Sequence, residues 1–296
     1  MTARKAAVLG FPVEHSRSPQ LHLAAYRALG LDDWTYDRIA CTADELPSVV
    51  SGFGPEWVGV SVTMPGKFAA LRFADERTER AQLVGSANTL VRTESGWRAD
   101  NTDVDGVAGA LDHRRDLRRA IVLGSGATAP AAVVALAGLG VTDITVAARN
   151  KHRAARLLEL GATLGARTHF ADLADTNLAD TNLADTNLID TNLIDTNLID
   201  TNLIDTSLAG QIERAEVLVS TIPSEAAALY ASSFAVVPVL LDAIYDPWPT
   251  PLAQAVANAG GQVVGGLQML LHQAYSQVEQ FTGRTAPRQQ MAAALD

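Results

Sequence analysis

The chain has 296 residues, of which 48% are apolar, and this is enough for two domains of ordinary size with separate cores. Its formal charge of −10 argues against a nucleic-acid partner. Eight of the acidic residues lie in one repetitive segment, however, and the net charge without them is −2. No apolar run approaches the roughly 20 residues of a membrane span and the N-terminus lacks a signal-peptide layout, so we expect a soluble, cytoplasmic protein without membrane partners.

A first buried strand is predicted at residues 5–11, and the polar loop PVEHSRSP follows it. Ser18 and Pro19 have the residue types of an N-cap and a first helical position, so a capping role alone would explain Ser18. Two serines and His15 in one loop at the end of a strand also suit a polar ligand. Both interpretations stay open on these residues.

A third strand, at residues 57–64, carries hydroxyl side chains where a buried strand normally carries apolar ones. Ser61 and Thr63 share one face of it, and Lys67 follows just beyond its end. Because polar side chains are costly to bury without partners, this pattern indicates a lined cleft. Around it the sequence predicts a strand at 34–41 with Cys41 in the core, a helix at 44–52 and a helix from 67 to 73.

A β-hairpin is expected from residues 85–91 and 97–101. One arm carries Asn88, and Asp103 follows the other arm and opens a helix at 104–111. Asp103 is a good N-cap, and that role alone would explain it.

Residues 120–149 have the pattern strand, glycine turn, helix, strand. The turn Gly124-Ser125-Gly126 would let a pyrophosphate approach the backbone and the first N–H groups of a helix at 127–138. The second strand ends at Arg149, where a positive charge favours the 2′-phosphate of NADP over the ribose of NAD. A solvated surface arginine is the plainer interpretation of Arg149.

The remaining alternation of strands and helices predicts an α/β protein with two domains. An N-terminal α/β substrate domain would comprise residues 1–105 and 267–296, and a Rossmann-like cofactor domain would comprise residues 106–266. The further elements are strands at 167–170, 215–221, 237–243 and 262–264, and helices at 152–164, 252–259 and 267–281.

Seven motifs, in order over nearly the whole chain, resemble those of the shikimate dehydrogenase family. They are PVEHSRSP, GVSVTMPGK, GSANTL, NTDVDG, the cofactor turn GSGATA, DAIYDPWPTPL and GLQMLLHQA. The resemblance implies reversible NADP-linked oxidation of shikimate to 3-dehydroshikimate, a reaction of aromatic amino-acid biosynthesis that needs no metal.

The resemblance also implies roles for individual residues, with Lys67 and Asp103 as the catalytic pair. A positioned ammonium can stabilise and protonate the alkoxide that forms when hydride reaches a ketone, and a neighbouring carboxylate would orient that ammonium. The implied substrate-binding residues are Ser16, Ser18, Ser61, Thr63, Asn88, Tyr245 and Gln273. The implied cofactor-binding residues are Gly124, Ser125, Gly126, Ala127, Arg149, Thr221, Ala243 and Gly266.

Three departures from the family pattern bear on this function. Ser61 stands where the pattern has Asn, so one substrate hydrogen bond would be shorter-reaching or water-mediated. Arg149 keeps the arginine of an N-R-T motif without its neighbours, and Ala127 replaces a glycine of the cofactor turn. A quinate/shikimate dehydrogenase that uses NAD therefore stays open as an alternative.

Residues 171–210 form eight pentads of the type TNLID, with leucine at every fifth position from Leu173 to Leu208. A period of five fits neither a helix nor a strand, and the segment resembles the pentapeptide-repeat family. This implies a short right-handed β-helix of two coils, inserted in the cofactor domain. Three interpretations stay open: a tolerated tandem expansion, a surface for self-association into a homodimer, or an interaction module on an inactive dehydrogenase scaffold.

Overall fold

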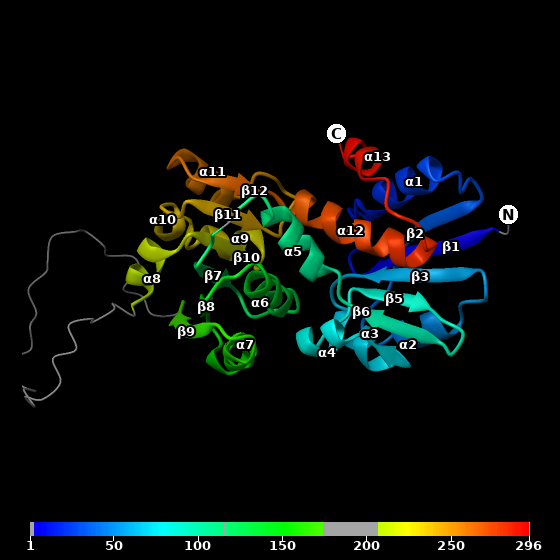
Figure 1. Cartoon of the computed structure of the whole chain (residues 1–296), viewed down its shortest axis with the longest axis horizontal. Helices are drawn as coiled ribbons and strands as arrows, with labels where there is room; N and C mark the ends of the chain where they lie inside the picture. The colour runs from blue at the N-terminus through cyan, green and yellow to red at the C-terminus, as the bar shows by residue number, and fades with distance from the viewer. Residues whose placement is uncertain (1–2, 115, 174–206, 296) are drawn as a thin grey trace, which may run out of the picture.

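The computed structural model of the protein describes residues 3–114, 116–173 and 207–295. Within these ranges two six-stranded sheets lie side by side along the long axis of the molecule (Figure 1). Helices α5 (Asp103–Leu111) and α12 (Gly266–Thr282) lie between the sheets. The predicted α/β class, with a Rossmann-like second sheet, is confirmed.

The first sheet is mixed and has the strand order β2-β1-β3-β5-β6-β4. Strand β1 pairs in parallel with β2 and β3, and the predicted hairpin of β5 and β6 adds antiparallel strands beside β3. Cys41 is buried as expected, one residue beyond the end of β2. The strands are β1 (Arg4–Gly10), β2 (Trp34–Ala40), β3 (Trp57–Val62), β4 (Glu76–Arg77), β5 (Thr89–Arg92) and β6 (Trp97–Asp100).

The second sheet is parallel throughout and has the order β12-β11-β10-β7-β8-β9. The strand order reverses between β7 and β10, which is the point where Rossmann folds bind a dinucleotide at the carboxyl ends of the strands. Its inner strands are almost wholly buried, as expected for parallel strands with helices on both faces. The strands are β7 (Arg119–Leu123), β8 (Asp143–Ala148), β9 (Arg167–Asp172), β10 (Val217–Ser220), β11 (Val239–Asp242) and β12 (Gln262–Val264).

The helices cover both sheets, and several of the short ones were not predicted. In the first half they are α1 (Ser18–Ala28), α2 (Leu46–Ser51), α3 (Lys67–Phe73), the unpredicted α4 (Glu79–Val84), and α5. In the second half they are α6 (Ala129–Gly138), α7 (Lys151–Thr163), α8 (Leu208–Arg214), α9 (Ser224–Ala228), α10 (Ala231–Phe234), α11 (Pro251–Asn258), α12 and α13 (Arg288–Ala293). Of these, α8, α9, α10 and α13 were not predicted.

Helix α12, which the sequence assigned to the first domain, packs in both cores. Met269 near its start packs in the core around α5, α6 and β7. Leu271, Val278 and Phe281 further along pack against α1 and β1 in the core of the first sheet. The two sheets lie on either side of the predicted boundary between residues 105 and 106, and the domain limits themselves stay a prediction.

Helix capping explains neither Ser18 nor Asp103. The N-cap of α1 is Arg17 and that of α5 is Thr102, so Ser18 and Asp103 are each the first helical residue, and neither N-cap side chain makes a capping hydrogen bond. Helix α6 begins at Ala129, two residues later than predicted, with Pro130 in its first turn. Because proline has no N–H, this helix start offers fewer backbone donors than the sequence suggested.

The two ends of the pentad segment belong to the second sheet and its helices. Strand β9 runs on to Asp172, and Leu173 packs in the core under β7 and β10. At the other end Ser207 caps α8, and Leu208 packs against the same core. Leu173 and Leu208 therefore do not stack inside a β-helix, because pairing of β9 with β8 and the start of α8 place them elsewhere. The β-helix and the homodimer surface predicted between residues 174 and 206 lie outside the described residues.

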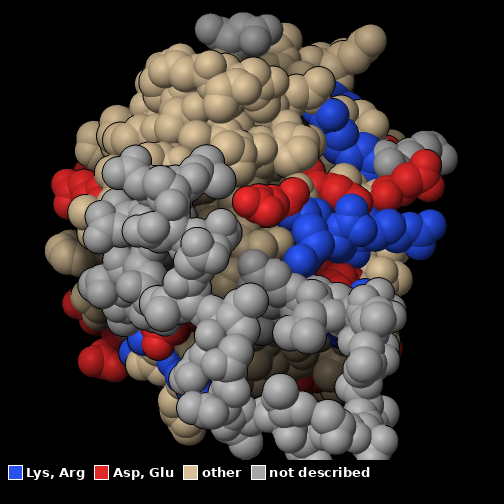
Figure 2. Space-filling view, turned by 90° about the vertical axis from the view of Figure 1, so that its left-hand side faces the viewer, with Lys and Arg blue, Asp and Glu red and all other residues tan. Residues whose placement is uncertain are grey.

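At the end of the molecule where β9 and α8 lie, Lys and Arg side chains form a short band with Asp and Glu side chains beside it (Figure 2). Opposite charges also pair at the amino ends of the parallel strands. Arg119 Nη2 lies 2.6 Å from Glu216 Oε1, and Arg167 Nη2 lies 2.9 Å from Asp143 Oδ2. Across the described residues no helix has the length and apolar character needed to cross a membrane.

One buried histidine makes the stability of the fold depend on pH. The His22 ring is fully buried and stacks on Tyr36 with a centroid distance of 4.0 Å, and burial lowers its pKa to about 3 against the hydrogen bond with Gln277. The unfolded chain protonates His22 below about pH 6.5, whereas the folded chain does not until near pH 3, so stability falls as pH falls through this window.

We therefore predict that the free energy of unfolding falls by about 2 kcal/mol more in the wild type than in His22→Phe between pH 7 and pH 5. Phenylalanine keeps the stacking shape and removes the titrating group, and Gln277 Oε1 still accepts from Ser61. Urea unfolding at the two pH values measures the difference. The same pH dependence in both proteins would contradict the assignment.

Candidate active site

A cavity of about 430 Å³ opens between the loops that follow β1 and β3 and the N-terminal half of α12. Its walls combine residues of the first sheet with Ala243, Ile244 and Gly266 from the end of β11 and the start of α12. All nine residues predicted to transform or bind substrate line it: Lys67, Asp103, Ser16, Ser18, Ser61, Thr63, Asn88, Tyr245 and Gln273.

Lys67 and Asp103 form an ion pair inside this cavity. Each is the first residue of a helix, α3 and α5, and Lys67 Nζ donates to Asp103 Oδ2 at 2.5 Å. The side chains are only 12% and 8% exposed. Lys67 Nζ also donates to Thr128 Oγ1 at 3.4 Å, at the N-terminus of α6. The ammonium thus lies where the first half of the chain meets the second sheet.

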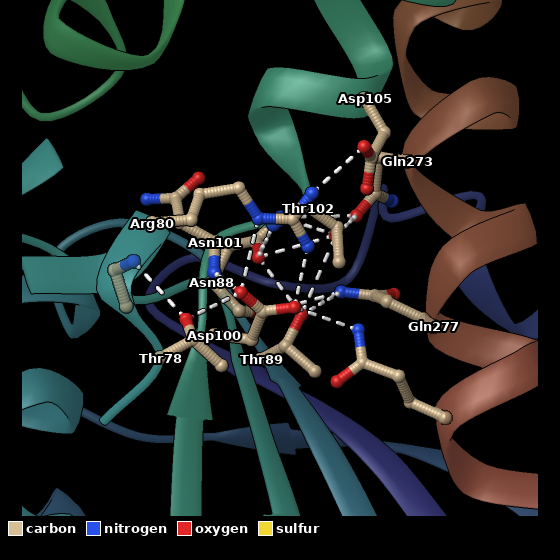
Figure 3. Close-up of polar contacts among 12 residues, drawn as sticks. Thr78, Arg80, Asn88, Thr89, Asp100, Asn101, Thr102, Asp105, Gln273 and Gln277 are labelled. Atoms are coloured by element: carbon tan, nitrogen blue, oxygen red, sulfur yellow. Dashed lines mark hydrogen bonds and ion pairs between the residues drawn. The ribbon is translucent and has the colours of Figure 1, made fainter. Parts of the chain in front are cut away.

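Asn88 holds the second oxygen of the Asp103 carboxylate. Its Nδ2 lies 2.9 Å from Asp103 Oδ1 and 3.1 Å from Gln273 Oε1, and its Oδ1 accepts the backbone N–H of Thr102 at 2.7 Å. Figure 3 shows Asn88, which directly precedes β5, converging with Thr102 at the start of α5 and Gln273 of α12. Because buried polar groups with all partners in place rigidify their surroundings, this network fixes how the carboxylate faces Lys67.

A buried relay of side chains holds the Ser61 hydroxyl. Tyr36 donates to Ser61 Oγ at 2.6 Å, and Ser61 donates to Gln277 Oε1 at 2.7 Å. Burial raises the pKa of Tyr36, so its phenol stays a donor. Gln277 lines the cavity and was not predicted, although it lies four residues after Gln273 on the same face of α12. Tyr36 carried no signal in the sequence beyond its place in a strand.

The loop after β1 and the first residue of α1 bring Ser16 and Ser18 to the cavity, and the Arg38 guanidinium lies behind Ser16. Arg38 donates through Nε and Nη2 to the backbone oxygen of Ser16, at 3.0 and 2.6 Å. Ser16 Oγ in turn accepts the backbone N–H of Ser18 at 3.3 Å. Across the cavity mouth burial raises the pKa of Tyr245, which keeps its hydroxyl protonated. Hydroxyl donors backed by a guanidinium suit an anionic group of a ligand.

A second cavity, of about 200 Å³, lies at the carboxyl ends of β7, β8 and β10. Gly124, Ser125, Gly126 and Arg149 line it as predicted, and Arg153, which was not predicted, joins them. The second positive charge could have been found from the basic run RNKHR that follows β8. A glycine turn at a strand end with two arginines nearby suits the phosphates of a dinucleotide.

The other predicted cofactor residues lie elsewhere along this edge. Thr221 sits against Gly124 at the end of β10, and Ala127 accepts a hydrogen bond from Ser86 at 3.2 Å. Ala243 and Gly266 line the larger cavity, where a Cβ on Gly266 would lie 2.4 Å from the Ala243 oxygen. A glycine is thus required for α12 to begin so close to the end of β11.

Three family models match the chain. Those described as the shikimate dehydrogenase substrate binding domain and the shikimate 5'-dehydrogenase C-terminal domain match residues 8–90 and 266–295. Eight copies of the pentapeptide repeat match residues 171–210. The resemblances found in the motifs and in the pentads are therefore confirmed.

Relatives with known names cover almost the whole chain. The shikimate dehydrogenase (NADP(+)) of Microcystis aeruginosa is 32% identical, over 97% of this chain and 94% of its own length. The crystal structure of Mycobacterium tuberculosis shikimate dehydrogenase is 64% identical, with a TM-score of 0.85 over 99% of this chain and 98% of its own. A Thermus thermophilus shikimate 5-dehydrogenase, solved in complex with NADP(H) and shikimate, is 26% identical with a TM-score of 0.75 over 98% of both chains. The chain therefore belongs to the shikimate dehydrogenase family.

Proposed function

We propose that this protein catalyses the reversible NADP-dependent reduction of 3-dehydroshikimate to shikimate, a cytoplasmic step of aromatic amino-acid biosynthesis. The observation that carries the proposal is the buried Lys67–Asp103 contact of 2.5 Å in a cavity that also reaches Gly266 and Thr128 at the second sheet. Relatives named shikimate dehydrogenase (NADP(+)) and the Thermus thermophilus complex with NADP(H) and shikimate support it.

Lys67 is the acid of the proposed reaction. NADPH, when bound, supplies the hydride that reduces the ketone, and NADP⁺ accepts it in the oxidation of shikimate. The Lys67 ammonium stabilises the negative charge that grows on the ketone oxygen and then protonates it. Asp103 orients the ammonium and accepts a hydrogen bond from a ring hydroxyl of the substrate. In the direction of oxidation the neutral amine takes the proton back.

The other polar groups of the cavity position the substrate. Ser16, Ser18 and Tyr245 are the donors for the substrate carboxylate, and the positive charge of Arg38 stands behind the serines. Thr63, Asn88 and Gln273 bind ring hydroxyls. Ser61 acts through the relay with Tyr36 and Gln277, because its hydroxyl donates to Gln277. Ser61 Oγ lines the cavity and can still accept a hydrogen bond from a substrate hydroxyl, although its side chain reaches one bond less far than asparagine.

The residues around the second cavity fit NADP. Gly124 has φ +111°, a conformation that glycine adopts freely, and a Cβ built on Gly126 meets no atom within 4 Å. The open face of Gly126 gives a pyrophosphate access to the backbone, and Arg149 and Arg153 are the groups for a 2′-phosphate. Arg149 is exposed, as the interpretation of a solvated arginine expects, and it lines the same cavity as the glycine turn.

The reaction is tested by initial rates with shikimate and either NADP⁺ or NAD⁺, on the wild type, Lys67→Ala and Lys5→Ala. We expect faster turnover with NADP⁺ than with NAD⁺, and a fall in kcat of about 10²-fold or more in Lys67→Ala because the acid–base group is gone. Lys5 is exposed at the start of β1, so its variant should keep wild-type rates. Absence of turnover in the wild type, or equal rates in both lysine variants, would contradict the proposal.

Substitutions at the two glycines of the turn test folding and cofactor binding independently. Gly124→Ala places a Cβ at φ +111°, 2.6 Å from Ile222 Cγ2, and should lower the free energy of unfolding by about 1–3 kcal/mol. Gly126→Ala meets no protein atom, so it should unfold like the wild type but bind NADP⁺ at least about tenfold more weakly. Urea unfolding and titration calorimetry with NADP⁺ measure the two effects. Wild-type NADP⁺ affinity in Gly126→Ala would place the pyrophosphate elsewhere.

A further inference from the structure

A group of charged side chains lies behind the catalytic pair without lining its cavity. Arg80 of α4 contacts two carboxylates, Asp100 at the end of β6 and Asp105 in the first turn of α5. These charges are largely buried, with Arg80 28% and Asp100 5% exposed. Charged side chains are rarely buried unless they are paired, and these three lie close to Asp103 in the chain or pair with residues that do.

The Arg80 guanidinium lies between the two carboxylates (Figure 3). Its Nε and Nη2 donate to Asp100 Oδ1 and Oδ2 at 3.0 and 2.5 Å, and its Nη1 donates to Asp105 Oδ1 at 2.7 Å. Burial alone would raise the pKa of Asp100, but the hydrogen bonds and charge of Arg80 outweigh it and lower the pKa. Asp100 is therefore ionised in the folded protein at neutral pH.

Asp100 also joins three neighbouring elements. It accepts hydrogen bonds from Thr78, which caps α4, at 2.7 Å, from the backbone N–H of Asn101 at 2.8 Å, and from Gln280 of α12 at 2.8 Å. A carboxylate with this many donors is held in one orientation. The end of β6 is thus fixed against α4 and α12 immediately before the catalytic segment begins.

The two carboxylates bracket Asp103 in the sequence. Asp100 lies three residues before it and Asp105 two residues after it. Residues two apart on a helix point to different sides, so Arg80 holds the first turn of α5 from one side while Lys67 and Asn88 hold Asp103 from another. A close approach at Gly106, where a Cβ would lie 2.7 Å from the Met269 oxygen, limits movement of α5 toward α12. The Arg80 guanidinium therefore restrains rotation of the first turn of α5 about the helix axis.

We propose that Arg80 is a positioning residue, which sets the rotation of the first turn of α5 and so places the Asp103 carboxylate against Lys67. This inference rests on the proposed function, since it assigns Asp103 a part in turnover. A planar guanidinium spans both carboxylates at once, and a lysine ammonium at the same position cannot. The substitution that keeps the charge but loses this geometry is therefore Arg80→Lys.

We expect Arg80→Lys to lower kcat for shikimate oxidation by about 10- to 100-fold, because small displacements of a catalytic group have effects of this size. KM for shikimate should change less than about threefold, since the cavity wall is intact, and NADP⁺ should bind as in the wild type. Arg77→Lys is the matched control, because exposed Arg77 donates only to the backbone oxygens of Leu71 and Arg72 in the bonds the structure gives it. The rates are measured well below the unfolding temperature of each variant, and NADP⁺ calorimetry counts the folded sites.

Asp105→Asn provides a second, milder variant at a half-buried position. It should lower kcat in the same direction, because the asparagine oxygen can still accept from Arg80 Nη1 but carries no negative charge. The double variant with Arg80→Lys should be no slower than Arg80→Lys alone, because both changes weaken the same contact. If Arg80→Lys fails to fold, Asp105→Asn is the deciding variant, and a kcat equal to that of the wild type in Asp105→Asn would overturn the proposal. A wild-type kcat in Arg80→Lys, or effects that multiply in the double variant, would overturn it as well. The wild-type rate with shikimate is measured first, because absence of turnover there would contradict the proposed function itself and not only the role of Arg80.

Discussion

The pairing of two buried charges, Lys67 and Asp103, is the constraint on which the rest of the structure depends. With the side chains 12% and 8% exposed, neither charge can be left without the other, since an unpaired buried charge costs several kcal/mol. The two residues are 36 positions apart and come from different helices, so strand β3 and the hairpin β5–β6 must hold a fixed register. The buried network around Asn88 fixes the carboxylate from the opposite side.

The second constraint is the position of that pair relative to the cofactor edge. A parallel sheet presents the carboxyl ends of all its strands at one edge, and here that edge carries the glycine turn, Arg149 and Arg153. Helix α12 begins against the end of β11 at Gly266 and then packs into the core of the first sheet. Helix α12 thus connects the carboxyl ends of the second sheet, which suit a cofactor, to the larger cavity, which suits a hydroxylated, anionic substrate. The contact of Lys67 with Thr128 lies at this junction.

The sequence predicted every strand of the two sheets except the two-residue β4, and its predicted helices begin within about two residues of the observed ones; its errors were the caps of α1 and α5 and the shortest helices. Apolar runs such as 120–123 mark parallel strands because both faces of such strands are covered. Residue type alone suggested that Ser18 and Asp103 cap helices, whereas each is a first helical residue whose side chain faces the cavity. Short helices such as α9 and α10 were missed because four or five residues carry no measurable periodicity. The pentad period also hid that Leu173 and Leu208 belong to the core of the second sheet.

Residues of the candidate site were predicted where they lie in a motif, and were missed where only the fold brings them to the cavity or behind it. All nine residues for which the motifs predicted a substrate or catalytic role line one cavity. Tyr36, Gln277 and Arg80 were missed because their partners lie 20 to 216 residues away in the chain, at distances that only tertiary packing closes. A hydrogen-bond relay and a buried guanidinium leave no local pattern, since each needs one polar residue at a position that is otherwise unremarkable.

The most direct test of this account is a crystal structure of the protein with NADPH and shikimate, a pair of reduced ligands that cannot react with each other. We predict a ring hydroxyl of shikimate within hydrogen-bond distance of Lys67 Nζ and of the Asp103 carboxylate. The diphosphate of the cofactor should lie at the turn formed by Gly124, Ser125 and Gly126. Shikimate bound with no ring hydroxyl near Lys67, or a cofactor bound away from that turn, would contradict the account.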